Sequence, residues 1–393
     1  MDEPKNIFKK HQAQTFPFPS CIEIESANGS YITDINGKQY LDFVAGVSAC
    51  TLGHSNSIII DAVKEQLDKY THVMVYGEYI QSPQYKLAQL LSDNLPESLS
   101  TTYFVNSGTE AIEGAMKLAK RSTGRSEIIS CKDSYHGSTQ GALSIMGNDE
   151  YKSRYRPLLP HCNQIIYNDE NSLINITKDT AAVVIEPIQG GTGFVIPKNN
   201  FLLKVREKCN ETGTILIFDE IQTCFGRLGT LFGFEKYNVI PDILCIAKGM
   251  GGGMPIGAFI SSWELMNLLT FEPKLGHITT FGGHPINCAA SLATLNHLLT
   301  SDLMTQVNKK EQLFRENLQH SMIKEIRGNG LMLSLEFEIE EIAQRVVEQS
   351  LIKGLILFYF LFTKTSIRIT PPLTITKEEI IKGCNIIKGI LDA

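Results

Sequence analysis

The chain has 393 residues, of which 43% are hydrophobic and 20% charged, and its formal net charge is −6. This apolar content can build a sizeable core, which excludes a disordered or fibrous protein, and the length predicts two domains or one large domain with a smaller companion. A slight acidic excess is the opposite of the basic surplus that nucleic-acid-binding proteins carry, so we expect no nucleic-acid partner.

The N-terminal segment lacks the apolar stretch of a secretory signal. The nine cysteines are scattered singly, with no CxxC pair and no tight spacing with histidine. This pattern predicts reduced, buried cysteines, no metal site and a cytoplasmic protein. The most apolar run, Gly354–Phe362, has only nine residues. Since that is too short to cross a bilayer as a helix, we expect a buried strand there and no membrane partner.

Residues 20–43 predict a small antiparallel meander, because Asn-Gly pairs at Asn28-Gly29 and Asn36-Gly37 separate short strand-like runs. Further apolar runs follow, most of them rich in Ile, Val and Phe and without period-2 alternation, which is typical of strands covered on both faces. These runs are Tyr103–Val105, Glu127–Cys131, Gln164–Tyr167, Ala181–Ile185, Ile215–Phe218, Ile243–Ala247 and Ile256–Ile260.

Helical patterns such as Glu110–Arg121 and Phe201–Thr212 lie between several of these strands. Alternation of this kind predicts a doubly wound, mostly parallel sheet. Beyond about residue 290, amphipathic helices mix with strands such as Leu331–Phe337 and Ser366–Ile369. We therefore expect a central α/β domain and a smaller α+β domain built from both chain ends.

The first chemical motif is the segment Phe104–Ala111, where a strand ends and a helix begins. Ser107 and Glu110 have the spacing of a capping box at this helix start. Free backbone N–H groups and the helix dipole favour an anion there, Gly108 lets a phosphate approach the backbone, and Thr109 adds a hydroxyl. Taken alone, the motif is explained more simply as an ordinary capped helix.

Two further apolar strands end in charged residues. The strand Ile215–Phe218 is followed by Asp219 and Glu220, at the edge where open α/β sheets bind ligands. The strand Ile243–Ala247 is followed by Lys248 and a run of glycines that matches neither a P-loop nor a Rossmann fingerprint. Burial lowers a lysine pKa from about 10.4 toward neutrality, which is what a Schiff-base lysine requires.

A phosphate cradle, a carboxylate and a lysine at three strand ends of one sheet suit a single cofactor. Pyridoxal phosphate needs an anion site for its phosphate, an acid that keeps its pyridine nitrogen protonated, and a lysine for its aldehyde. The three motifs together therefore predict a pyridoxal-phosphate site.

Over nearly its whole length the sequence resembles the class III pyridoxal-phosphate aminotransferases, the family of ornithine, acetylornithine and 4-aminobutyrate aminotransferases. The resemblance implies the α/β fold of type I PLP-dependent transferases. It predicts a large cofactor domain at 47–285 with a mostly parallel seven-stranded sheet, and a small α+β domain from 1–46 and 286–393. The segments that carry the resemblance are Asp34–Asp42, Asn106–Ala111, Tyr135-His136-Gly137, Glu186–Gly190, Asp219–Gln222, Lys248-Gly249 and Arg368–Leu373.

The resemblance also implies the catalytic residues. Lys248 would form the Schiff base with the cofactor, and Asp219 would bond the pyridine N–H. Thr280 matches a threonine that reaches the phosphate from the neighbouring subunit, which implies a homodimer with a shared active site. The remaining cofactor positions that it implies are Ser107, Gly108 and Thr109 at the phosphate, Tyr135 on the ring face and Gln222 near the phenolic oxygen.

For the substrates, Arg368 matches the arginine that binds the α-carboxylate of glutamate or 2-oxoglutarate, and Glu186 matches its usual ion-pair partner. We expect Glu186 to neutralise Arg368 while the amino donor is bound and to release it to the oxo acid. Three positions depart from the common family pattern, namely Cys224, Ser138 and His284.

The resemblance implies a transaminase that moves the terminal amino group of an ω-amino donor to 2-oxoglutarate, giving a semialdehyde and glutamate. Ornithine or N-acetylornithine is the preferred donor, with 4-aminobutyrate or lysine as alternatives. Two other hypotheses stay open: a glutamate-semialdehyde-type aminomutase, which needs no external oxo acid, and a non-catalytic protein that binds the cofactor.

Overall fold

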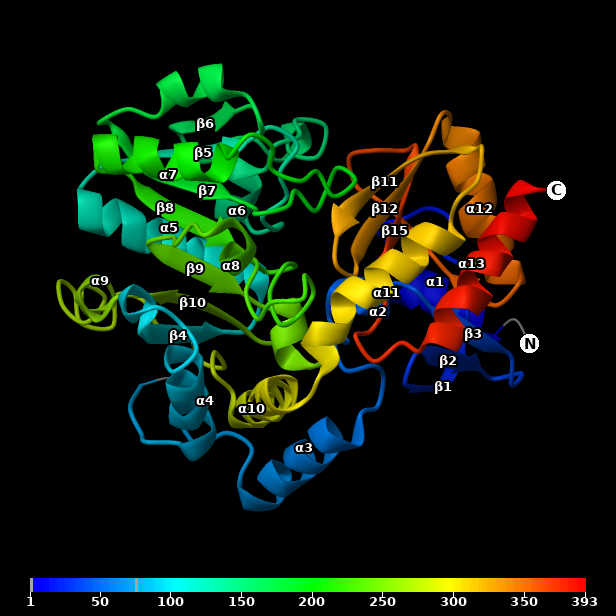
Figure 1. Ribbon diagram of the computed structural model, residues 1–393. Coiled ribbons are helices and arrows are strands. Elements are labelled where there is room, and N and C mark those ends of the chain that lie inside the picture. Colours follow the sequence, from blue (N-terminus) through cyan, green and yellow to red (C-terminus); the bar gives the residue numbers. More distant parts are fainter. Residues whose placement is uncertain (1–2, 75–76) are drawn as a thin grey trace.

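The computed structural model describes residues 3–74 and 77–393 and has a large α/β part beside a smaller part built from both chain ends (Figure 1). A seven-stranded sheet in the order β4-β10-β9-β8-β7-β5-β6 forms the centre of the large part. Strand β10 is antiparallel to both neighbours, and the other pairs are parallel. The strands are β4 (Thr101–Val105), β5 (Glu127–Cys131), β6 (Cys162–Ile165), β7 (Thr180–Ile185), β8 (Ile215–Asp219), β9 (Ile243–Ile246) and β10 (Gly257–Ser261). The predicted mostly parallel sheet is confirmed.

Both faces of this sheet are covered, which explains why its strands are apolar without alternation. In β8, Leu216 and Phe218 pack in one cluster with residues of α7 (Phe201–Thr212). Ile217, between them, packs in a second cluster with residues of α5 (Gly108–Thr123). Successive side chains of a strand point to opposite faces, so a strand between two helical layers needs an apolar residue at every position.

Short helices and turns complete the large part. Helices α3 (Ser57–Lys69) and α4 (Ser82–Ser92) pack against α10 (Pro285–Thr300). The predicted boundary at residue 286 would assign α10 to the small domain, and that division stays a prediction. The remaining helices of this region are α2 (Ala45–Ser48), α6 (Gln140–Ile145), α8 (Phe234–Tyr237) and α9 (Trp263–Asn267), with 3₁₀ turns η1 (Glu97–Leu99), η2 (Ser153–Tyr155), η3 (Glu170–Asn175) and η4 (Lys248–Gly251).

The smaller part contains two four-stranded sheets, in the orders β1-β2-β3-β13 and β11-β12-β15-β14. The predicted N-terminal meander is confirmed as the antiparallel strands of the first sheet. The strands are β1 (Ile24–Asn28), β2 (Tyr31–Asp34), β3 (Gln39–Asp42), β11 (Ile323–Asn329), β12 (Met332–Phe337), β13 (Leu355–Ile356), β14 (Phe358–Tyr359) and β15 (Ser366–Ile369). Its helices are α1 (Glu3–His11), α11 (Leu303–Asn317), α12 (Glu340–Ile352) and α13 (Lys377–Leu391).

One sequence prediction about this part is wrong. The apolar run 354–362 forms two short strands instead of one buried strand. Strand β13 pairs in parallel with β3, whereas β14 pairs with β15 in the other sheet. The chain therefore crosses between sheets at Leu357, and Phe358 remains 51% exposed.

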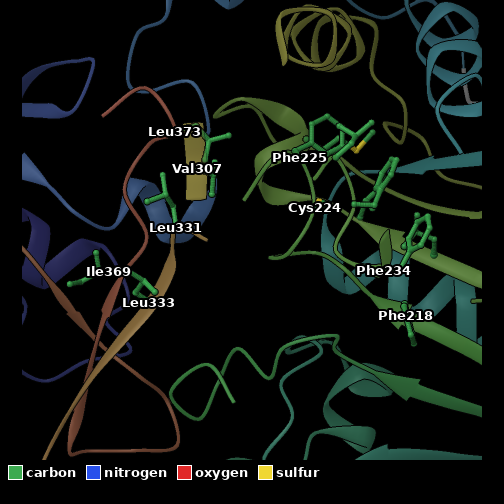
Figure 2. Close-up of a cluster of buried hydrophobic side chains, with 14 of the residues drawn as sticks. Phe218, Cys224, Phe225, Phe234, Val307, Leu331, Leu333, Ile369 and Leu373 are labelled. Carbon is green, nitrogen blue, oxygen red and sulfur yellow. The ribbon is translucent and has the colours of Figure 1, made fainter. Parts of the chain in front are cut away.

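The two parts share one apolar core. The side chains labelled in Figure 2 belong to a single buried cluster that continues from the central sheet into the smaller part. Phe218 and Phe225 come from the large part, and Leu333 and Ile369 from the strands of the small one. This shared core fixes the two parts relative to each other, and their junction borders the carboxyl edge of the sheet.

All nine cysteines are free, as predicted. Six of them are buried, while Cys21, Cys50 and Cys162 are partly exposed, so the expected burial is only partly confirmed. Within residues 3–74 and 77–393, no helix is both long enough and apolar enough to cross a membrane.

Candidate active site

The candidate active site lies where the parallel strands β8 and β9 end. Asp219 is the last residue of β8, and Lys248 follows β9 closely and opens η4. Lys248 has a left-handed backbone (φ 42°). A Cβ on Gly249 would lie 2.5 Å from the Thr51 hydroxyl oxygen, so only glycine lets η4 pack this closely. The strand ends and this tight turn thus place a lysine beside a carboxylate.

Burial lowers the pKa of Lys248 below its ordinary value. The negative charges of Asp219 and Glu186 act against this lowering, and the positive charge of Arg368 adds to it. Charge–charge interactions weaken with distance, so each of these three charged groups lies near Lys248. Four predicted site residues from separate parts of the chain therefore share one site. A lysine with a lowered pKa has a larger neutral fraction at a given pH, so its amine is better able to accept a proton.

His136 is a site residue to which the sequence analysis assigned no role. Its Nδ1 lies 2.7 Å from Oδ2 of Asp219, and both side chains are buried. Burial alone would lower the pKa of His136, but the hydrogen bond to Asp219 and the negative charges of Asp219 and Glu186 together raise the pKa above its ordinary value. The backbone N–H of Ile221 donates to the other oxygen of Asp219, at 3.1 Å. Both oxygens of the Asp219 carboxylate therefore have a hydrogen-bond partner. The motif Tyr135-His136-Gly137 was the sequence feature from which a role for His136 could have been inferred.

Glu186 follows β7 and is also buried. One carboxylate oxygen accepts from the Gly190 N–H at 2.8 Å, and the other from the Tyr135 N–H at 3.3 Å. Burial raises the pKa of Glu186 to about 7; the His136 charge opposes that rise, and the Asp219 charge adds to it. Near neutral pH this carboxyl group is therefore only partly ionised.

The ion pair predicted between Glu186 and Arg368 is not formed, since the described residues contain no such pair within 4.0 Å. The physical reason is that Glu186 is satisfied by backbone N–H groups and partly neutral. The Arg368 guanidinium has other neighbours: its Nε donates to the carbonyl oxygen of Tyr359 at 3.1 Å, and the ring of Phe360 lies 4.8 Å from its carbon. The two residues share the site without pairing in this conformation.

The predicted phosphate cradle lies at the N-terminus of α5. The Ser107 hydroxyl accepts from the Glu110 N–H at 3.3 Å, as predicted, but the Glu110 carboxylate accepts from the Asn106 N–H at 2.6 Å. Only half of the capping box therefore forms, because Glu110 reaches one residue beyond the cap. A Cβ on Gly108 would lie 2.7 Å from Ile221, so this glycine is also required by the packing beside Asp219.

Tyr135 and Gln222 lie at the same edge of the sheet. The Tyr135 side chain is half-buried, and its hydroxyl lies 3.2 Å from the Ser138 hydroxyl. Gln222 donates from Nε2 to the Ser48 hydroxyl at 3.2 Å. A Cβ on Gly190 would lie 2.7 Å from Oε1 of Gln222, so the loop after β7 passes directly over this amide.

Thr280 is the one predicted cofactor residue whose own side chain is exposed. The neighbouring Thr279 is anchored, since its hydroxyl accepts from the Asn106 side-chain amide at 3.3 Å and from the Gly282 N–H at 3.1 Å. The loop that carries Thr280 is thus tied to the start of the phosphate motif while Thr280 itself points into solvent. This placement suits a residue that serves a second subunit.

The donor set of this site fits pyridoxal phosphate. A helix N-terminus is available for a phosphate, a buried carboxylate held by His136 for a ring N–H, and a lysine with a lowered pKa for an aldehyde. Gly137 allows a close approach at the cradle, because a Cβ there would lie 2.2 Å from the Thr109 hydroxyl oxygen. In the part of the chain that the structure describes, no group of three or more His, Cys, Asp and Glu could hold a metal ion.

Comparison with known proteins extends over both parts of the molecule. The family described as Aminotransferase class-III matches residues 12–391. The acetylornithine aminotransferase of Methanopyrus kandleri is 38% identical over 386 residues, which are 98% of this chain and 97% of that protein. The crystal structure of the ornithine aminotransferase from Toxoplasma gondii has a TM-score of 0.92 at 28% identity, covering 100% of this chain and 95% of that one. An amine transaminase of an uncultivated Pseudomonas species, solved in its PLP-bound form, has a TM-score of 0.89 at 27% identity, covering 98% and 99%.

Proposed function

The chain belongs to the class III aminotransferases, which are PLP-dependent transaminases, and we propose that it moves the terminal amino group of ornithine or N-acetylornithine to 2-oxoglutarate. The products are the corresponding semialdehyde and glutamate. The observation that carries the proposal is a buried guanidinium, that of Arg368, in the same site as Lys248 and Asp219 and without a carboxylate partner among the described residues. Such a cation is a receptor for a substrate carboxylate.

The residues of the chain divide the chemistry between them. Pyridoxal phosphate, when bound, supplies an electron sink that acidifies the carbon bearing the amine. The Nζ of Lys248 takes the proton from that carbon and returns a proton at the end of the transfer, for which its lowered pKa suits it. Asp219, oriented by His136, keeps the proton on the ring nitrogen. Ser107, Gly108 and Thr109 hold the phosphate, and Tyr135 and Gln222 border the ring.

The acceptor assignment depends on Arg368. Its guanidinium can bind the α-carboxylate of 2-oxoglutarate in a bidentate manner. An aminomutase needs no external oxo acid, so a free carboxylate receptor favours the aminotransferase over that alternative. The donor assignment is supported by the acetylornithine aminotransferase of M. kandleri and the ornithine aminotransferase of T. gondii; 4-aminobutyrate and lysine are the second choice.

An amino-donor screen against 2-oxoglutarate tests the proposal. We expect kcat/KM for ornithine or N-acetylornithine to exceed that for 4-aminobutyrate and lysine at least about tenfold, which is the discrimination that a few extra substrate contacts supply. Glutamate formation by the purified holoenzyme is the measurement. Turnover of a glutamate semialdehyde without any oxo acid would identify an aminomutase, and a colourless protein without turnover would identify a non-catalytic member.

We also propose a cytoplasmic homodimer with shared active sites. Free cysteines throughout the chain suit a reducing compartment. Near Thr280, residues on both sides of 75–76 lie beside the segment 278–284: the rings of His72 and Phe281 are 5.0 Å apart, and Nε2 of Gln84 donates to the carbonyl oxygen of Gly283. These segments expose large apolar side chains, with Ile80 94% and Phe281 55% exposed. Apolar surface gathered in this way is typical of a subunit interface.

Mixed dimers test the shared site. Thr280→Ala should weaken PLP retention, because the hydroxyl completes the phosphate site of the partner. A dimer of one Thr280→Ala and one Lys248→Ala subunit should have one intact site and one doubly altered site. After dialysis against limiting PLP, random mixing should restore activity to about a quarter of the wild-type sites. A mixture no more active than its parents would show that Thr280 serves its own subunit.

A further inference from the structure

Arg368 carries a buried positive charge that must be stabilised by groups other than a carboxylate. It lies in β15, is 5% exposed, and burial lowers its pKa to about 10, so it remains protonated near neutral pH. Within residues 3–74 and 77–393, no acidic group lies within 4.0 Å of its guanidinium. An isolated buried charge is strongly unfavourable unless other groups stabilise it.

Two aromatic rings provide that stabilisation. The guanidinium carbon lies 4.8 Å from the ring centre of Phe360 and 5.9 Å from that of Phe194. The two rings contact each other edge to face, with their centres 4.7 Å apart and an interplanar angle of 82°. The negative face of an aromatic ring attracts a cation, and the attraction strengthens where water is excluded, as it is around these buried rings.

The two rings come from different parts of the molecule. Phe194 lies in the turn region after β7, in the large part, and Phe360 follows β14 in the small part. On the β14 side, the carbonyl oxygen of Tyr359 also accepts from Nε of Arg368 at 3.1 Å. The stem of the arginine is thereby fixed, while within the described residues only Nε of the guanidinium donates a hydrogen bond, which leaves the two terminal nitrogens available.

We propose that Phe360 and Phe194 form an aromatic bracket that holds the Arg368 guanidinium in place when no carboxylate is bound and presents its two terminal nitrogens to the carboxylate of the oxo acid. The bracket takes the part that the sequence assigned to Glu186. An ω-amino donor, with no carboxylate beside its reacting carbon, can then occupy the site without facing an uncompensated cation. The inference rests on the proposed function, because it assumes that Arg368 receives the acceptor carboxylate. Phe360 and Phe194 are positioning residues.

Binding of glutarate, an unreactive dicarboxylate, to the holoenzyme tests the bracket by calorimetry. Phe360→Leu should weaken glutarate about tenfold and raise KM for 2-oxoglutarate to the same extent, with kcat changed less than about twofold. Phe360→Tyr retains the ring face and should bind glutarate within about twofold of wild type. The matched control is Phe337→Leu, at a buried phenylalanine of β12 that has no cation–π contact with Arg368.

The possible results distinguish failure of the aromatic bracket from failure of the proposed role of Arg368 as the acceptor-binding residue. Unchanged or tighter glutarate binding in Phe360→Leu would overturn the bracket, as would an equal loss in Phe337→Leu. Arg368→Gln should abolish glutarate binding; if it does so while Phe360→Leu does not, only the bracket fails. If Arg368→Gln binds glutarate normally, the acceptor assignment fails with it. Should Phe360→Leu not fold, Phe194→Leu tests the second ring in the same way, with a smaller expected loss because that ring is farther from the guanidinium.

Discussion

Replacing Lys248 with alanine should lower transamination by at least about four orders of magnitude, because one amine is both the attachment point of the cofactor and the group that moves the proton. The cradle at the start of α5 and the Asp219 carboxylate remain, so the variant should still bind PLP, without the visible band of the lysine-linked form. Stopped-flow rates and absorbance spectra of the purified variant measure both effects.

A second buried lysine supplies the control. Lys152 is 9% exposed, its Nζ donates to the Met146 carbonyl oxygen at 2.9 Å, and burial lowers its pKa as well. Lys152→Ala should therefore lower the melting temperature while kcat stays within about twofold, since its amine bonds the backbone of Met146 and none of the predicted site residues. Substantial turnover by Lys248→Ala without added amines would reject the assignment of Lys248.

Asp219→Asn should lower kcat by about 10³-fold, the scale at which a single preorganised charge contributes in a water-excluded site. The amide keeps the shape of the carboxylate but cannot hold a proton on a ring nitrogen by its charge. We expect the cofactor to remain bound and linked to Lys248, so the absorbance of the linked form separates loss of catalysis from loss of cofactor.

The carboxylate of Asp242, which directly precedes β9, offers a comparison because it contacts β8, the strand that carries Asp219. It accepts from the Leu216 N–H of β8 at 2.7 Å and pairs with Arg206 at 2.8 Å, so it anchors β8 near the end opposite to Asp219. Asp242→Asn should reduce stability while activity at low temperature stays near wild type. Near wild-type activity in Asp219→Asn would show that its charge is dispensable.

The sequence predicted the part of the site that follows from strand order. Asp219 and Lys248 each follow an apolar run, and neighbouring parallel strands end at the same edge of a sheet. The contact between Asp219 and His136 could not be predicted from the sequence, because the two residues are 83 positions apart. A histidine in a loop also has no hydrophobic periodicity that would indicate its position. The same holds for the surroundings of Arg368, which combine a turn after β7 with a strand near the C-terminus.

The wrong prediction of one strand over 354–362 has a local physical cause. The run 354–362 is uniformly apolar, and nothing in its composition marks Leu357 as the residue where the chain changes sheets. The pairing of Glu186 with Arg368 while the amino donor is bound stays a prediction, and in the structure the two backbone N–H groups of Tyr135 and Gly190 donate to the Glu186 carboxylate instead. Patterns predict which elements form, whereas protonation and partner choice depend on what the fold brings together.

The pairing of β13 with β3 sets an order in which this chain can be completed during synthesis. Leu41 of β3 pairs with Leu355 of β13, so the N-terminal sheet stays incomplete until a strand more than 300 residues later has been synthesised. At ribosomal rates the delay is roughly 15–60 s. The strands of the central sheet lie together between residues 101 and 261, so the large part can fold during this interval. Until then β3 has an open edge, the kind of surface that chaperones shield in a nascent chain.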